Sequence, residues 1–594
     1  MANENSDALA TPLLIKRLII MCLVSFGVYF IGQRTIFNMQ QSIACSVFIA
    51  IIMGTLFFWT FRLAIAFLGI AILVLTNSLS IATFVSSSSL EVIIFLVGMM
   101  IIVGALKDLG FFTWVVQCIV SMPNITGRKF IAVTATTSAL LACAVDEVTS
   151  IIFISTIIFH VCERLKVSAT PYIIICVLCT NVGSAGTMMG NPVGIYIGTK
   201  AGLTFGDFMC FSLPIMLIAL LVTIKFTMFF YRKELDLFDQ NLKERLEKNL
   251  SLITKVDVPY RQGVTLLLMT ITFIAFHHQL EHLLGLGKNS MLLVAPLICA
   301  GIVMIWKRDR ARDYVEHEVD WWTLIFFMLL FSIAGTLAHT GVDRVIAREF
   351  SKVCGTSLFS LVPFILSVAA VGSAFVDNVI FVAAFAPIIE QLSLTLNALP
   401  LWWALLFGAC FGGNITMIGS TANIVALGML EKKSSAHITF LQWFKIGFIA
   451  TLISGGVALI GILALSPFMK DRYSLVSWKE FKGTQAERFQ EKNVVISAKL
   501  GQQVQHATED FPEDQYTCFK IHNQFLSYKQ DETLDAIYIY IEKNSSLENK
   551  IKQSSENQLY DFYGTAQYSN ELKQTYPVWI LLHKVEKSNQ ELED

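Results

Sequence analysis

Long apolar runs, separated by short polar connections, make up the chain as far as about residue 470. Many of these runs reach the roughly 20 residues that a helix needs to cross the hydrocarbon core of a membrane. The pattern predicts an all-α polytopic membrane protein with eleven spans, at about 17–33, 42–59, 63–85, 90–106, 170–199, 208–231, 263–283, 289–306, 321–340, 401–430 and 440–467.

Two further apolar stretches, 129–160 and 357–392, carry charge near their middle, and we predict that each enters the membrane and turns back as a re-entrant hairpin. Their turns hold two adjacent acids in the first and an acid beside an amide in the second: Asp146, Glu147, Asp377 and Asn378. An acidic side chain at membrane depth is costly, so such residues are functional sites by default. We predict that Asp146 and Asp377 cap the second helix of each hairpin, which leaves helix ends inside the membrane where a ligand can bind.

Two of the spans, 170–199 and 401–430, are interrupted by glycines and polar residues. Glycine permits unusual dihedrals and close backbone approach, so these breaks can form the wall opposite the hairpin tips. Amide and hydroxyl oxygens of the first tip and of both breaks are predicted to contact an ion or substrate: Thr149, Asn181, Ser184, Thr187, Asn191, Asn414, Thr416, Ser420, Thr421 and Asn423. Such oxygens suit a hard cation such as sodium, whereas half-helix N-termini suit an anion, so the ligand class stays open.

The chain contains an internal repeat. Three blocks recur at offsets of 231, 231 and 229 residues: 104–110 with 335–341, Asp146 with Asp377, and 187–190 with 416–419. Each copy holds five of the predicted spans and one hairpin. Because five is odd, the second copy is inverted relative to the first, as in many secondary transporters. We therefore predict two inverted five-span repeats, each with a re-entrant hairpin and a broken helix.

Polar segments indicate how the chain is divided. We expect an N-terminal segment with the first helix, two transmembrane repeats that flank a charged linker, and a C-terminal tail: 1–41, 42–231, 232–262, 263–467 and 468–594. Lys and Arg concentrate in the loops of one side, which favours a cytoplasmic N-terminus and linker and places the tail outside. The linker is expected to be helical and solvated. The tail contains β-like runs at 536–541 and 578–582, which predict a small α+β appendage.

The composition supports a membrane protein, since 55% of the residues are hydrophobic and 15% are charged, against about 25% charged in soluble domains. The formal net charge of -1 gives no sign of a nucleic-acid partner. We find no nucleophile–base pairing and no metal-ligand spacing, so an enzyme is disfavoured. No cofactor is expected beyond a proton or sodium as coupling ion, and sodium, at the residues named above, is the one metal considered. The expected partners are membrane lipid and a small ion or anion.

The interrupted segments 181–192 and 401–423 resemble those of an ion-transporter superfamily that contains arsenical pump permeases, NhaD-type sodium/proton antiporters, citrate transporters and sodium/dicarboxylate symporters. The second segment is especially similar to the arsenical-permease pattern. The resemblance covers roughly residues 42–467. It implies an elevator-type mechanism, in which hairpins and broken spans move against a scaffold of the other spans, often within a homodimer. We accordingly expect an integral, multi-pass protein of the bacterial inner (plasma) membrane.

These observations predict a secondary active transporter of an inorganic ion or small anion. We expect coupling to protons or sodium, by antiport or symport, and place the chain nearest the arsenical-pump and sodium–proton antiporter branch. The neighbouring acids Asp146 and Glu147 favour proton coupling, because two adjacent carboxylates in a dry site do not both stay ionised. One alternative is a sodium-coupled citrate or dicarboxylate transporter. Another, from a different class, is a non-transporting membrane receptor with a signalling tail.

Overall fold

The computed structural model describes residues 11–122, 125–247, 260–284, 290–354, 357–393, 397–434, 438–469, 474–475, 493–504, 515–522, 536–543, 545–552, 559–568 and 578–587. Its contacts divide the chain into two compact units. One unit is helical and covers Met1–Gln391 and Ala398–Met469. The other, Lys470–Asp594 with Leu392–Asn397, contains a β-sheet.

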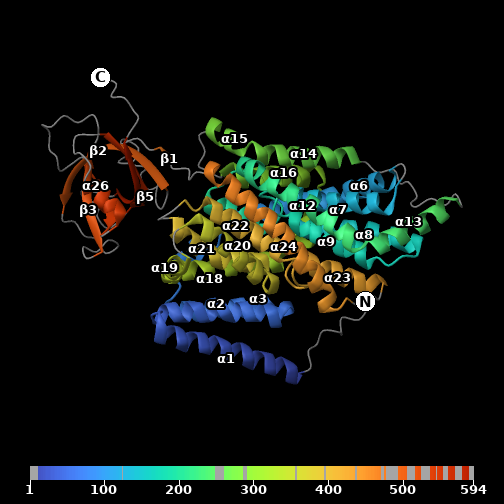
Figure 1. Ribbon diagram of the computed structural model, residues 1–594, viewed down its shortest axis with the longest axis horizontal. Helices are drawn as coiled ribbons and strands as arrows, with labels where there is room; N and C mark the ends of the chain where they lie inside the picture. Colours follow the sequence, from blue (N-terminus) through green and yellow to red (C-terminus); the bar gives the residue numbers. More distant parts are fainter. Residues whose placement is uncertain are drawn as a thin grey trace. The chain divides into compact units, whose positions relative to one another are not determined.

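The helical unit is a bundle of helices joined by short connections (Figure 1). Its earlier helices are α1 (Thr11–Thr35), α2 (Met39–Phe57), η1 (Trp59–Phe61), α3 (Arg62–Leu75), α4 (Ile81–Ser87), α5 (Leu90–Asp108), α6 (Phe111–Val120), α7 (Gly127–Ala144), α8 (Glu147–Leu165), α9 (Thr170–Gly183), α10 (Pro192–Ala201), α11 (Phe205–Asp207), η2 (Phe208–Ser212), α12 (Leu213–Phe230) and α13 (Arg232–Glu247). Its later helices are α14 (Tyr260–Ala275), α15 (His277–Leu284), α16 (Ser290–Trp306), α17 (Ala311–Asp313), η3 (Tyr314–Glu318), α18 (Trp321–His339), α19 (Val342–Cys354), α20 (Leu358–Phe375), α21 (Asn378–Ser393), α22 (Leu399–Gly412), α23 (Thr421–Ser434), α24 (Phe440–Leu465) and η4 (Ser466–Phe468).

The described ranges contain eight helices that are long and apolar enough to cross a membrane. Shorter apolar helices accompany them, among them α9 and α22, which belong to the two broken spans. The prediction of a mainly helical, polytopic membrane protein is confirmed at this level.

Two predicted spans are each divided into two helices. The segment predicted at 63–85 forms α3 and α4, because Asn77 takes a left-handed conformation (φ 52°) and Ser80 caps a new helix. The segment predicted at 263–283 forms α14 and α15, and the His277 ring lies 2.8 Å from a backbone carbonyl of the preceding turn where the two helices meet. Polar side chains that bond to the backbone can thus end helices that hydropathy alone joins.

The two stretches predicted as re-entrant hairpins each form a pair of helices joined by a short turn, α7 with α8 and α20 with α21. α8 and α20 are each long and apolar enough to cross a membrane, so re-entry stays a prediction. The Asp146 carboxylate accepts a hydrogen bond from the Thr149 amide at 2.7 Å. The Asp377 carboxylate accepts one from the Val379 amide at 3.0 Å. Each acid therefore caps the second helix of its hairpin, as predicted, and the positive partial charge of the helix N-terminus favours an acid there.

The two predicted interruptions are also present. Residues 184–191 separate α9 from α10, and residues 413–420 separate α22 from α23. Pro192 starts α10, and the Asn191 side chain caps it by accepting a hydrogen bond from the Gly194 amide at 2.9 Å. Proline suits the first position because an N–H there has no partner within the helix. Both breaks therefore bring helix ends to the inside of the bundle.

The two hairpins pack on the broken helices in the same way. Gly183 of α9 lies so close to α7 that a Cβ there would overlap the backbone of Ala139. Gly412 of α22 meets Ala370 of α20 in the same manner. The glycines are 229 residues apart and the alanines 231, which are the offsets of the sequence repeat. The two halves of the chain that repeat in sequence therefore also repeat this contact between hairpin and broken helix.

Gly412→Ala is expected to destabilise the protein by about 1–3 kcal/mol or more, because the added methyl group forces α20 and α22 apart. Gly456→Ala is a matched control, since a Cβ at this position of α24 meets no atom within 4 Å. The midpoint of thermal unfolding in detergent measures both variants. Equal midpoints for the two would contradict the close approach of α20 and α22.

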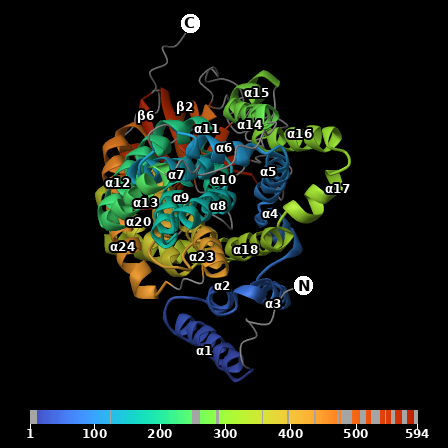
Figure 2. The same ribbon diagram turned by 90° about the vertical axis from the view of Figure 1, so that its right-hand side faces the viewer.

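Packing separates the helices into two groups. The hairpins and broken helices pack with α12 and α24, and we call α7–α10, α12 and α20–α24 the core helices. The peripheral helices, α2–α5, α14, α16 and α18, pack mainly among themselves. α1 lies along α2 at the edge of the unit in both views (Figures 1 and 2). Every residue of the predicted site therefore lies on the core helices or in the turns between them.

The segment predicted as a solvated linker begins with α13, one face of which is buried. The buried residues of this face are Leu235, Phe238 and Leu242. The Phe238 ring stacks on Phe130 of α7, and the Asn241 amide donates to the Leu165 carbonyl at the end of α8 at 2.9 Å. The described part of the segment is thus helical, as expected, but it is docked on the first hairpin by one face and is solvated only on the other. Apolar residues at a three-to-four spacing are the sign of an amphipathic helix. Residues 248–259 of the predicted linker lie outside the described residues.

Asp343 makes the folding stability depend on pH. It lies in the charged, amphipathic helix α19, and burial raises the pKa of its carboxyl to about 6, although the Arg344 amide donates to it at 2.8 Å. Because the folded-state pKa exceeds the unfolded value, the stabilisation is full below about pH 4 and is lost as the pH rises through about 6.

Asp343→Asn is therefore expected to stabilise the protein at pH 8, by up to about 3 kcal/mol, and to have little effect at pH 4. The asparagine oxygen can still accept the hydrogen bond from the Arg344 amide. Midpoints of thermal unfolding at the two pH values test this. If the unfolding midpoints of variant and wild type differed by the same amount at pH 4 and at pH 8, Asp343 would not titrate in this range.

The second unit is a small closed sheet. Its elements are β1 (Ser474–Leu475), β2 (Asn493–Val504), β3 (Tyr516–His522), β4 (Ala536–Glu542), α26 (Ser546–Lys552), β5 (Leu559–Tyr568) and β6 (Val578–Lys587). The strand order is β1-β2-β3-β4-β6-β5, and β5 also pairs with β2, so the strands from β2 onward close into a ring. The β4–β6 pair is parallel, whereas β2–β3, β3–β4, β5–β6 and β2–β5 are antiparallel.

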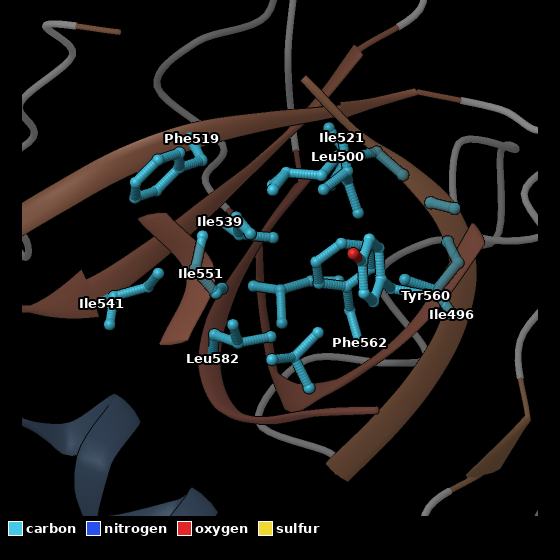
Figure 3. Packing of buried hydrophobic residues seen from close by; sticks show 14 of the residues in the cluster. Ile496, Leu500, Phe519, Ile521, Ile539, Ile541, Ile551, Tyr560, Phe562 and Leu582 are labelled. Carbon is cyan, nitrogen blue, oxygen red and sulfur yellow. The ribbon is translucent and has the colours of Figure 1, made fainter. Parts of the chain in front are cut away.

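The interior of this ring is filled by aliphatic and aromatic side chains (Figure 3). Ile539 of β4 and Phe562 of β5 are fully buried there, and Ile551 of α26 packs against them. The strands predicted at 536–541 and 578–582 are present as β4 and β6. The tail contains both strands and a helix, as predicted, but its closure was not predicted.

Candidate functional site

Polar side chains from the two breaks meet at one buried place. The Asn181 amide of α9 donates to the side-chain oxygen of Asn414 at 2.8 Å and to that of Asn423 at 2.9 Å. The Asn181 oxygen accepts a hydrogen bond from the Ser420 hydroxyl at 3.0 Å. All four side chains are buried. A satisfied buried network of this kind holds its members in one arrangement, so it fixes the two broken helices against each other.

Glu147, the first residue of α8, reaches the same place from the tip of the first hairpin. The Ser420 Oγ lies 3.4 Å from Oε1 of Glu147, and because the single hydrogen of this hydroxyl is also directed to the Asn181 oxygen at 3.0 Å, the contact with Glu147 is the weaker, shared one. The Ser184 hydroxyl is also near this carboxylate, whose Oε2 is buried and makes no hydrogen bond of its own. Asp377 of the second tip is near enough to act electrostatically on Glu147. Leaving a buried carboxylate oxygen without a partner is costly. A proton or a cation bound to this oxygen would remove that cost.

Asp377 contacts the second break directly. The Thr421 hydroxyl, at the start of α23, donates to Oδ2 of Asp377 at 3.1 Å, while Oδ1 caps α21. Asp146 bonds instead to Thr149 of its own tip. The repeat therefore does not give its two N-cap acids equal surroundings, and at the first tip Glu147, rather than Asp146, reaches the opposite break.

Two of the predicted ligands tie each break to its own hairpin. The Thr187 hydroxyl donates to the carbonyl of Cys143, and the Thr416 hydroxyl donates to the carbonyl of Ala374. Each of these carbonyls lies three residues before the capping acid of its hairpin. The hydroxyl hydrogens of both threonines are thereby engaged, and the two bonds hold tip and break together as one structural element.

The remaining predicted residues form the walls of the site. The Asn191 amide donates to the Ser184 hydroxyl at 3.1 Å and to the Cys410 sulfur of α22 at 3.1 Å. Asn378, at the second tip, accepts a hydrogen bond from the Ser373 hydroxyl at 2.7 Å. The structure thus brings the predicted residues of both tips and both breaks into one region, with Asn181, Ser420 and Glu147 at its centre.

Residues 48–408 match a family described as citrate transporter. The chain belongs to this family. Two uncharacterised transporters of Mycobacterium tuberculosis are 32% identical over 61% of this chain and 83% of their own length. The human P protein is 25% identical over 63% of this chain, which spans about half (53%) of that protein.

Among solved structures, that of the YdaH transporter of Alcanivorax borkumensis matches 65% of this chain and 87% of its own, with a TM-score of 0.46 and 11% identity. The family model and the two Mycobacterium tuberculosis relatives are described as transporters. This citrate transporter family member is therefore an integral, multi-pass membrane protein and a transporter, not an enzyme.

Sequence reasoning missed a buried cation of this family member, Arg62. It is the first residue of α3, and among the lysines and arginines that the structure describes it is the one with a buried side chain, 6% exposed. The available signal was an isolated charge between the apolar runs 42–59 and 63–85. A basic residue at the end of a span normally lies at the membrane interface, which is why it was not chosen.

Proposed function

We propose that this chain is a secondary active transporter that moves a small anion or inorganic ion, coupled to protons or sodium. The observation that carries the proposal is the meeting of both hairpin tips and both helix breaks at one buried polar site, centred on the Asn181–Asn414 hydrogen bond. Helix ends inside a membrane are tolerated where they line a site, and a site shared by two repeats can open to either side.

The packing supports an elevator-type mechanism. The core helices carry every predicted site residue, and their packing against the peripheral helices is less extensive than their packing among themselves. We propose that the core helices move as one body against the peripheral helices, and that the two repeats are inverted. We also propose a homodimer in the bacterial inner membrane, since only 6% of the apolar window of α1 is buried within the described part of the chain.

Coupling is proposed to occur at Glu147. Its unpartnered Oε2 is an acceptor for a proton, and the oxygens of Glu147, Ser420 and Thr421 are of the kind that bind sodium. Ser420 bonds to Glu147 of the first tip and to Asn181 of the first break, so a proton or ion here would act on both repeats at once. In symport the coupling ion crosses together with the substrate, whereas in antiport it crosses in the opposite direction on the return step.

A sodium-coupled citrate or dicarboxylate importer is the second candidate, and the family match favours it. The similarity of residues 401–423 to the arsenical-permease pattern favours an inorganic substrate instead. Both candidates use the same site, so flux measurements have to separate them.

Proteoliposomes of the purified full-length chain test the proposal. Counterflow across sodium, arsenite, phosphate, citrate and succinate identifies the substrate. Dissipation of a pH gradient on adding sodium supports sodium–proton exchange, and sodium-dependent uptake of labelled citrate or succinate supports the second candidate. The absence of any flux, together with partner binding that requires the tail, would instead support a membrane receptor.

A further inference from the structure

Arg62 is buried in an aromatic cradle formed by peripheral helices. Its guanidinium carbon lies 3.8 Å from the centre of the Trp59 ring and 4.9 Å from that of the Phe326 ring. Arginine stacks on aromatic faces because its planar cation is weakly hydrated and attracted to the ring. These stacking contacts fix the plane of the guanidinium, and they leave its edges for hydrogen bonding.

One edge of this guanidinium is incompletely bonded. Nη2 donates to the Thr323 hydroxyl at 3.3 Å, and that hydroxyl donates in turn to Asp320 at 2.7 Å. Nε, on the same edge, is buried and has no hydrogen-bond partner. Nε and Nη2 together are the pair of donors that arginine offers to a carboxylate or a phosphate oxyanion in a bidentate contact. The edge that binds anions is therefore held in place and partly unused.

The charges around Arg62 do not satisfy it. In the described part of the chain, no carboxylate oxygen lies within the 4.0 Å ion-pairing distance of its guanidinium. Asp377 of the second hairpin tip and Asp320, the N-cap residue of α18, are the acids that act on it electrostatically, Asp377 more strongly. A buried charge without a close counter-ion is strongly unfavourable, so this position is suited to an anion that arrives from outside.

We propose that Arg62 binds an anionic group of the transported substrate, a carboxylate or a comparable oxyanion, through the Nε–Nη2 edge, on the side of the second hairpin tip. This inference rests on the proposed transport function and names the substrate charge that the site recognises. Arg62 belongs to the peripheral helices and Asp377 to the turn between two core helices, and Asp377 is the acid that acts most strongly on Arg62, so the anion would be bound between the two groups of helices.

The negative charge of Asp377 favours binding of the anion together with a cation. An anion on Arg62 lies near the carboxylate of Asp377, and like charges repel strongly in a poorly solvated site. A sodium ion bound beside Asp377 would remove this repulsion. Binding of the anion and of such a cation at the second tip would therefore favour each other, separately from the coupling step proposed at Glu147.

The test uses the purified full-length chain in phosphatidylcholine vesicles, which contain no anionic lipid, and measures uptake of labelled citrate, succinate and phosphate. Arg62→Gln is expected to raise KM for the transported anion by about tenfold or more, because one partner of a buried charge pair is lost. Arg62→Lys keeps the charge but not the bidentate edge, and should show a smaller increase. Arg17→Lys is the matched control, since Arg17 is a partly buried arginine that donates to the Phe57 carbonyl at 3.2 Å.

A binding measurement separates this inference from the proposed function. In detergent, citrate, succinate or phosphate should raise the unfolding midpoint of the wild type, and Arg62→Gln should remove that shift, whether or not the protein transports. The shift should grow in Asp377→Asn and vanish again in the double variant. An anion-induced shift or a KM that is unchanged by Arg62→Gln would overturn the proposal. The proposal would also be overturned if Arg62→Gln no longer reduced the anion-induced shift once Asp377 is replaced by asparagine. Arg62 would then act only as a counter-charge to Asp377 and would not bind the anion.

Discussion

Asp377→Asn is expected to lower coupled flux by about 100-fold or more, because it removes a charge from a buried site. The variant should still fold. An asparagine oxygen can accept the hydrogen bond from the Val379 amide that caps α21, so the cap at the second tip survives. The other side-chain atom changes from acceptor to donor, and it then faces the Thr421 hydroxyl, which donates to Oδ2 at 3.1 Å in the wild type. The loss thus combines a missing charge with a mismatched contact to the second break.

Flux in proteoliposomes, with equal protein incorporated, measures this loss. Asp146→Asn is expected to abolish flux in the same way at the first tip, where the Thr149 amide bond can likewise be kept. Asp236→Asn is the control, since that aspartate lies on α13, is 58% exposed and pairs with Arg128. Wild-type flux in both tip variants would show that the intramembrane acids are only helix caps.

The acids and the breaks could be predicted from sequence because burial in a membrane makes polar residues informative. Asp146 and Asp377 stand out in apolar runs, and their spacing of 231 residues marks them as copies of one feature. The N-cap role followed from position alone. The same reasoning gave 184–191 and 413–420 as breaks, since glycines and amides interrupt otherwise apolar spans.

The partners of these residues could not be predicted, because they depend on how distant segments pack. Asn181 bonds to residues more than 230 positions away, and no local pattern chooses Asn423 over a neighbour. Thr187 was expected to face a ligand, yet its hydroxyl reaches a carbonyl of the hairpin next to it. The closed sheet of the tail has the same origin, since the β2–β5 pairing joins two strands that β3, β4 and α26 separate in the sequence.

Glu147→Gln is expected to separate coupling from substrate binding. Glutamine keeps the length of the side chain and can still accept the hydrogen bond from the Ser420 hydroxyl, so the contact between the first tip and the second break is retained. What it removes is the buried, unpartnered Oε2 as an acceptor for a proton or a cation. Uptake driven by a pH or sodium gradient should therefore fall by about 100-fold, as for loss of a buried charge.

Counterflow of the substrate between the two sides needs no net movement of the coupling ion, and in Glu147→Gln it should stay within about fivefold of the wild type, a change near 1 kcal/mol. Glu91→Gln is the control, because Glu91 is also an acid in the first turn of its helix but is exposed. Gradient-driven uptake at the wild-type rate would place the coupling ion elsewhere. Loss of counterflow together with uptake would make Glu147 part of the substrate site. If Glu147 is the coupling carboxylate, counterflow should be retained while gradient-driven uptake is lost. Such a carboxylate links release of the coupling ion to the movement of the core helices, but it does not bind the substrate itself.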